Sequence, residues 1–93
     1  MVVKNSQIGN TTYSETQKDF LVILDKIEKI VTDTKNQELE DALYAVQDET
    51  KKKSWNKKLI TMGLNAMKGV ANELAVSGLM ELIEKGLEQI HLL

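Results

Sequence analysis

The sequence predicts an all-α fold, a small antiparallel helical bundle of three to four helices that follows an N-terminal extended arm or short β-hairpin. Apolar residues recur every three or four positions over most of the chain, which is the period of an amphipathic helix. Proline is absent and only short polar breaks separate the periodic segments, so neighbouring helices should run antiparallel. A chain of 93 residues is long enough for a single domain.

Residues 1–14 differ from the rest of the chain and are predicted to form the arm or hairpin. Val2, Val3 and Ile8 favour strands, and Gly9–Asn10 is typical of a two-residue hairpin turn. A hairpin of two strands is only marginally stable alone. This segment should therefore lie on the helices, pair with another chain or remain disordered.

The helical bundle is predicted over residues 15–93, and its first helix over about 15–32. Ser14 is a suitable N-cap, and Gln17, three residues later, would complete a capping box. The apolar residues of this helix form one stripe: Phe20, Ile23, Leu24, Ile27, Ile30 and Val31.

The second helix is predicted over about 37–53 and has a thinner apolar stripe. The residues of this stripe are Leu39, Ala42, Leu43 and Val46, with Thr50 continuing the line. Acidic residues in the first turn and lysines in the last suit the helix macrodipole. Most of this helix is therefore expected to face water.

The C-terminal third carries two apolar stripes on opposite sides of one helical wheel. The first belongs to a helix predicted over about 55–76, with Ser54 as its N-cap, and the second to a helix over about 78–92. A single straight helix cannot turn both stripes toward one core. The chain therefore either breaks near Ser77–Gly78 or forms one long helix between two partners. The first stripe contains Leu59, Ile60, Gly63, Met67, Val70, Ala71 and Leu74.

The first of these stripes is expected to close the core together with Phe20, Ile27, Leu39 and Val46. The second is expected either to fold back on that core or to be buried by another copy of the chain, because a row of exposed large apolar side chains would favour aggregation. Burial by another copy predicts an interface whose residues are Leu79, Met80, Ile83, Leu87 and Ile90.

A basic patch is predicted between the second and third helices, where five lysines surround the single tryptophan. Its residues are Lys51, Lys52, Lys53, Trp55, Lys57 and Lys58. Such a patch could bind single-stranded nucleic acid or a membrane surface. Because the chain offers one tryptophan and no arginine, the sequence favours a solvated turn whose tryptophan packs on the edge of the bundle.

The overall charge disfavours nucleic acid and membranes as partners. The chain has 12 basic and 14 acidic residues, a net charge of -2. Charged residues recur every turn or two in residues 59–93, which disfavours a membrane-spanning helix.

An acidic run could mimic the phosphates of nucleic acid, although a solvated helix face is the favoured interpretation. The run consists of Glu38, Glu40, Asp41, Asp48 and Glu49.

Residues suited to catalysis or metal binding are scarce. Cysteine is absent, and the sole histidine, His91, lacks a cluster of carboxylates at ligand spacing. No serine–histidine arrangement and no glycine-rich phosphate loop is present. We therefore expect no enzyme activity, no catalytic or metal-binding residues and no cofactor.

Three segments give the chain a familiar layout. They are the lead-in S-Q-I-G-N-T-T-Y over residues 6–13, a helical hairpin rich in lysine and glutamate, and a glycine- and alanine-rich helix over Met67–Ile83. This layout resembles the short C-terminal helical modules of bacterial abortive-infection and other anti-phage proteins, and small proteins carried by prophages. The resemblance implies self-association or docking onto a larger protein, and it brings no catalytic residues.

The sequence thus favours a non-enzymatic helical interaction protein that self-associates and binds a larger protein, as a regulator or inhibitor in the conflict between bacteria and phages. The residues near the N-terminus are polar where a signal peptide would be apolar, so a cytoplasmic location is expected, in the host cell if a phage encodes the chain. Two alternatives stay open: a membrane-acting amphipathic helical protein, and a small inhibitor that binds or mimics nucleic acid.

Overall fold

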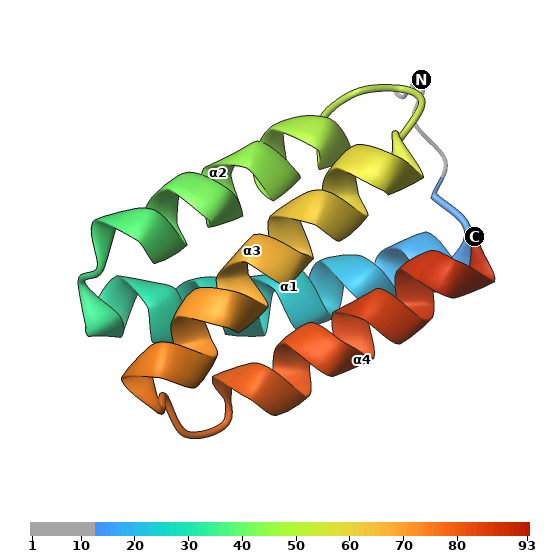
Figure 1. Ribbon diagram of the computed structural model, residues 1–93. Helices are drawn as coiled ribbons and strands as arrows, with labels where there is room; N and C mark the ends of the chain where they lie inside the picture. The colour runs from blue at the N-terminus through green and yellow to red at the C-terminus, as the bar shows by residue number, and fades with distance from the viewer. Residues whose placement is uncertain (1–12) are drawn as a thin grey trace, which may run out of the picture.

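The computed structural model describes residues 13–93, which form four α-helices and no strand. The helices alternate in direction around one apolar core (Figure 1). The predicted all-helical bundle is therefore confirmed for this part of the chain, whereas residues 1–12 of the predicted arm or hairpin lie outside it. The helices are α1 (Glu15–Thr34), α2 (Gln37–Thr50), α3 (Lys57–Leu74) and α4 (Leu79–Leu92).

Local hydrogen bonds define the ends of the first two helices. Ser14 Oγ accepts a hydrogen bond from the Gln17 N–H at 3.1 Å, and Gln17 Oε1 accepts one from the Ser14 N–H at 2.9 Å, so the predicted capping box is confirmed. α1 ends where Lys35 adopts the left-handed conformation, with φ 56°. Asn36 then caps α2 by accepting a hydrogen bond from the Leu39 N–H at 3.0 Å. With only two residues between them, the helices run antiparallel.

The connection between α2 and α3 differs from the prediction. α2 ends at Thr50 instead of near residue 53, and α3 begins at Lys57 instead of Trp55. Trp55 lies outside both helices, where its indole Nε1 donates a hydrogen bond to the Thr50 carbonyl oxygen at 3.1 Å. The N-cap of α3 is consequently Asn56 and not Ser54, since the Asn56 side chain accepts a backbone hydrogen bond from the first turn of α3.

The core contains the apolar stripes predicted for the first two helices. In α3 the buried stripe is narrower than predicted, because Leu59 and Leu74 at its edges are each 45% exposed. Leu64, which was not assigned to that stripe, is fully buried. The buried apolar residues of α1 are Phe20, Leu24, Ile27 and Val31, and those of α2 are Leu39, Leu43 and Val46.

The chain breaks between its two C-terminal stripes, which is the first of the two alternatives predicted for this region. α3 is followed by Ala75 in the left-handed conformation, with φ 53°, and Gly78 precedes α4 with φ 83°. Glycine adopts such a conformation without strain from a Cβ atom. The break reverses the chain, so that the second stripe faces the same core as the first.

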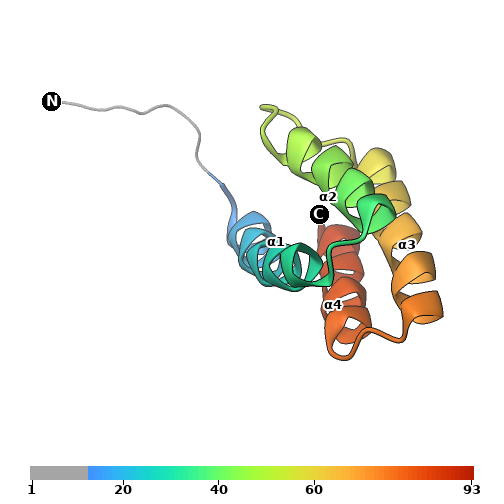
Figure 2. The same ribbon diagram turned by 90° about the vertical axis from the view of Figure 1, so that its left-hand side faces the viewer.

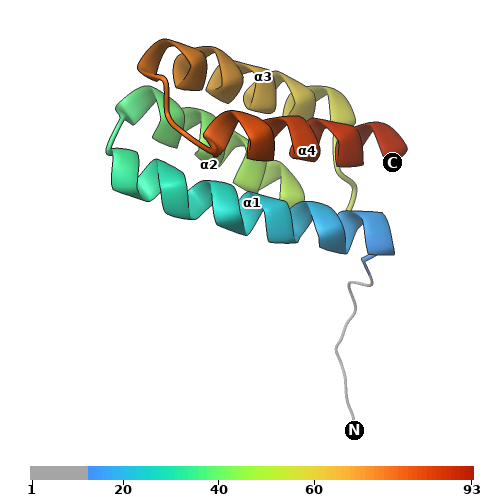
Figure 3. The ribbon, with the colours of Figure 1, turned by 90° about the horizontal axis from the view of Figure 1, so that it is seen from below.

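α4 lies between α1 and α3 (Figure 3). At Gly86, a Cβ atom would lie 3.4 Å from Phe20 Cε1 of α1 and 3.7 Å from Leu64 Cδ1 of α3, so one point of α4 meets both neighbours. α1 contacts α2 far less than it contacts α4. The helices therefore follow the order α1, α4, α3, α2 around the core (Figure 2). We call the side between α2 and α1, where contacts between neighbouring helices are sparsest, the open side of the bundle.

Candidate interaction surfaces

The five residues predicted as an interface between copies lie on the inner side of α4. Leu79 and Ile83 are fully buried, and Ile90 is 2% exposed. Met80 and Leu87 are partly buried and pack against the core. Their stripe thus folds back on the core of its own chain, the alternative to burial by another copy.

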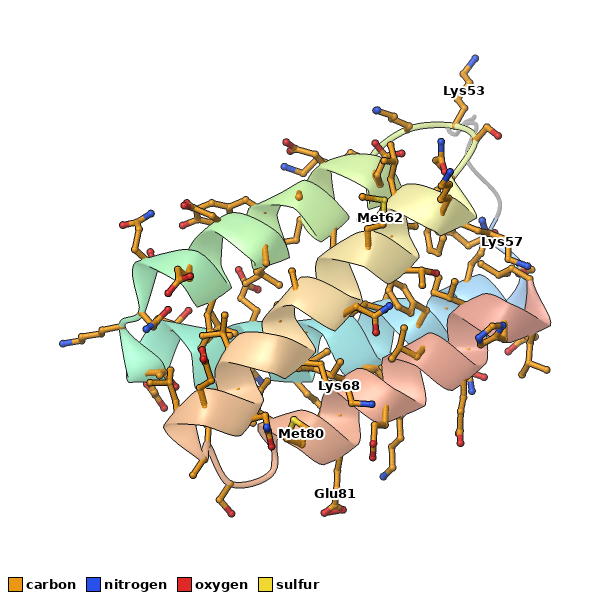
Figure 4. All side chains as sticks on the ribbon, viewed as in Figure 1. Lys53, Lys57, Met62, Lys68, Met80 and Glu81 are labelled. Atoms are coloured by element: carbon orange, nitrogen blue, oxygen red, sulfur yellow. The ribbon has the colours of Figure 1, made fainter. Side chains whose placement is uncertain are left out.

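The lysines of the predicted basic patch lie at the end of the bundle where α2 connects to α3. All five are exposed, and Figure 4 shows Lys53 and Lys57 at this end. Lys52 Nζ lies 2.6 Å from Glu49 Oε2, so the charge of Lys52 is paired with a carboxylate that is almost completely buried. The structure therefore brings the lysines together but leaves one of them engaged within the chain.

Trp55 of this patch is not a free platform on which a base could stack. Its ring centroid lies 5.7 Å from that of Phe20 in an edge-to-face arrangement, and 5.9 Å from that of Tyr13. Its indole N–H is already bonded to the Thr50 carbonyl oxygen. Trp55 is thus anchored by apolar packing and by its polar group, as expected for a tryptophan that holds a structure together.

The remaining polar candidates do not form a chemical site in the described residues. Glu38, Asp41 and Asp48 of the acidic run are exposed on α2, whereas Glu49 of the same run is only 6% exposed. His91 is exposed in the last turn of α4. Within residues 13–93, no group of three or more His, Asp or Glu side chains is placed to hold a metal ion. None of the helices in this range combines the length and apolar character needed to cross a membrane.

An apolar hollow that sequence reasoning missed lies between α2 and α3, and we call it the α2–α3 hollow. Its volume is about 320 Å³. Small residues make up much of its lining, while Leu59 and Met62 are 45% and 58% exposed beside them; Figure 4 shows Met62 on α3 next to α2. The residues that line the hollow are Ala42, Ala45, Glu49, Leu59, Met62, Gly63 and Ala66.

The small residues of α3 are the sequence signal for this hollow. At Gly63 a Cβ atom would lie 2.5 Å from Val46 Cγ2 and 3.5 Å from the Ala42 carbonyl oxygen, so this glycine lets α2 approach closely. Ala66, one turn further, is exposed, as is Met62. The spacing of small residues favours the close approach of another backbone, but it does not say which backbone approaches or where the contact ends.

A second surface runs along the open side of the bundle, and we call it the α1–α2 groove. It comprises two cavities of about 130 Å³ and 380 Å³, and Glu28 lines both of them. Their apolar lining consists of Leu21, Leu24, Val31 and Leu43, with the Tyr44 side chain beside them. The charged residues that line them are Asp25, Glu28, Glu40 and Lys51.

Comparisons of the chain with protein-family models, with curated proteins and with solved structures found no match. The resemblance to anti-phage modules therefore stays a prediction from the sequence.

Proposed function

We propose that this chain is a non-enzymatic helical interaction protein that self-associates through the α2–α3 hollow. The observation that carries the proposal is the combination of a projecting apolar side chain and a hollow on one surface. Met62 is 58% exposed and stands beside the exposed small residues Ala45 and Ala66. A twofold contact joins the same surface of two copies, so Met62 of each copy can enter the hollow of the other.

The chemistry of the hollow favours such a contact. Methionine is flexible and is enriched in the cores of protein interfaces, from which charged residues are depleted. The one charged residue that lines the hollow, Glu49, is paired with Lys52 of the same chain. Two copies can therefore approach without bringing unpaired charges of the same sign together in the centre of the contact.

The test is sedimentation velocity on the purified chain and on the variant Met62→Glu at several micromolar concentrations. We expect the unaltered chain to form dimers and the variant to be monomeric, because a carboxylate would be desolvated in an apolar contact. Val22→Glu is the matched control: Val22 is 55% exposed, close to the value for Met62, but lies on α1 outside the hollow. Circular dichroism should show that all three proteins are folded.

Two results would contradict the proposal. One is an unaltered chain that stays monomeric over the whole concentration range. The other is a dimer that Met62→Glu and Val22→Glu weaken equally, since this would mean that the contact does not lie over the α2–α3 hollow.

A further inference from the structure

The α1–α2 groove is long enough for about three turns of a further helix to lie along it. Its lining residues run from Leu21 to Thr32 on α1 and from Glu40 to Lys51 on α2. At 1.5 Å per residue, each wall is about 16 Å long, which corresponds to about three helical turns. Because both walls are α-helices, their backbone N–H and C=O groups are bonded internally. An extended peptide would therefore find no strand edge to pair with, whereas a helix could pack by its side chains.

The charges along the groove are unequal. Asp25 and Glu28 line its middle, Glu40 lines the end near the α1–α2 connection, and Lys51 lines the opposite end. Asp25 lies 3.8 Å from Lys29, but both side chains are exposed, so this pair screens the charge only weakly. Within residues 13–93, Glu28 and Glu40 form no ion pair. The groove therefore presents negative charge from its middle to the end near the α1–α2 connection, beside apolar side chains.

We propose that the α1–α2 groove binds an amphipathic basic helix of another protein. The apolar stripe of that helix would pack against the half-buried Leu21 and the exposed Tyr44, above the buried Leu24 and Leu43, and its Lys or Arg residues would face Glu28 and Glu40. The same carboxylates repel nucleic acid. Lys51 at one end favours an acidic residue of the partner there, which fixes the direction of the bound helix.

The inference rests on the proposed interaction function and adds the class of partner, but it uses a different surface. Self-association depends on Met62 and is measured without a peptide. Failure of either proposal therefore leaves the other one testable.

The probe is a labelled helical peptide of about 18 residues, with capped ends, a leucine stripe and lysines flanking it. Fluorescence anisotropy should show saturable binding to the full chain. A control peptide with glutamate in place of each lysine should bind at least about tenfold more weakly, a difference that a few like-charge contacts can produce. Hydrogen exchange should show protection by the lysine peptide along α1 and α2.

The two decisive variants each reverse the charge at one glutamate position. Glu28→Lys should weaken binding of the lysine peptide by about tenfold. Glu88→Lys, which makes the same charge change at an exposed position of α4, should alter it by less than about twofold. Tyr44→Ala, at a groove position that is 55% exposed, should weaken binding without unfolding the chain.

Three outcomes would overturn the inference. Equal weakening by Glu28→Lys and Glu88→Lys would mean a general attraction between opposite charges. Weakening by Met62→Glu alone would place the peptide in the α2–α3 hollow. Absence of saturable binding to the folded chain would mean that the groove does not accept a basic helix.

Discussion

α2 packs closely against α3 but much less closely against α1, although α2 is joined to each of them by a short connection. The more closely packed pair has the longer connection, six residues against two. At the α2–α3 contact Gly63 meets Val46. Across the α1–α2 groove the facing residues include Leu24, Leu43 and the carboxylate-bearing Glu28. The comparison indicates that the size and charge of the facing side chains, more than the length of the connection, set how closely two helices approach.

Trp55 joins α1 to α2 at the end of the bundle near the α2–α3 connection. Its ring packs against Phe20 of α1, and its N–H bonds the last residue of α2. It therefore links two helices that are held together directly only by the Lys35–Asn36 connection and by sparse packing.

The largest expected effect comes from removing this link. Trp55→Ala should lower the free energy of unfolding by about 3 kcal/mol, because a large, half-buried side chain and its hydrogen bond are lost together. Trp55→Phe keeps a ring in place and should cost about 1 kcal/mol. Urea unfolding measures both losses. It is followed by circular dichroism and not by tryptophan fluorescence, because the variants lack the only tryptophan. A loss for Trp55→Ala no greater than that for Trp55→Phe would show that the ring does not join the helices.

A smaller effect on the free energy of unfolding is expected at the contact between α2 and α3. Gly63→Ala should lower the free energy of unfolding by about 2 kcal/mol, because the new methyl group would lie 2.5 Å from Val46 Cγ2 and the helices would have to separate. Gly69→Ala in the same helix meets nothing within 4 Å and should raise that free energy by about 0.8 kcal/mol through helix propensity. Urea unfolding of both variants checks the sign, and an equal response at the two positions would contradict the close approach of α2.

The smallest effect is expected in the connections themselves. Lys35→Gly should raise the free energy of unfolding by about 1 kcal/mol, because Lys35 has a positive φ that glycine adopts without strain. Lys51→Gly should lower it by about 0.5 kcal/mol, because Lys51 has φ -84° and glycine adds only freedom to the unfolded chain. Thermal unfolding followed by circular dichroism gives both values. Changes of the same sign would mean that the backbone conformation at Lys35 stores no strain.

Features determined by near neighbours could be predicted from the sequence. The capping box of Ser14 and Gln17 and the buried stripe of α1 depend on residues three or four positions apart, and both are found as predicted. The stripe that begins at Leu79 was predicted by its periodicity. Periodicity specifies which residues share a face but not what covers that face, so the choice between the chain's own core and another copy needed the structure.

Features that depend on distant residues could not be predicted in the same way. Trp55 lies outside the helices, and its ring packs on Phe20, which is far away in the sequence. Leu59 was assigned to the core because its periodicity fits, but it lies at the rim of a hollow whose other wall is α2. Both candidate surfaces consist of residues from two helices, so their positions follow from how the helices pack.

The position of α4 between α1 and α3 has a consequence for the order in which the bundle can form. Of the four described helices, α1 is synthesised before the others and α4 after them, yet α1 makes its main contact with α4. The side of α1 that carries Phe20 and Ile23 against Gly86 stays uncovered while α2 and α3 are being made. α1 can therefore complete its native packing only after α4 has left the ribosome, and until then an apolar side of α1 is exposed to water.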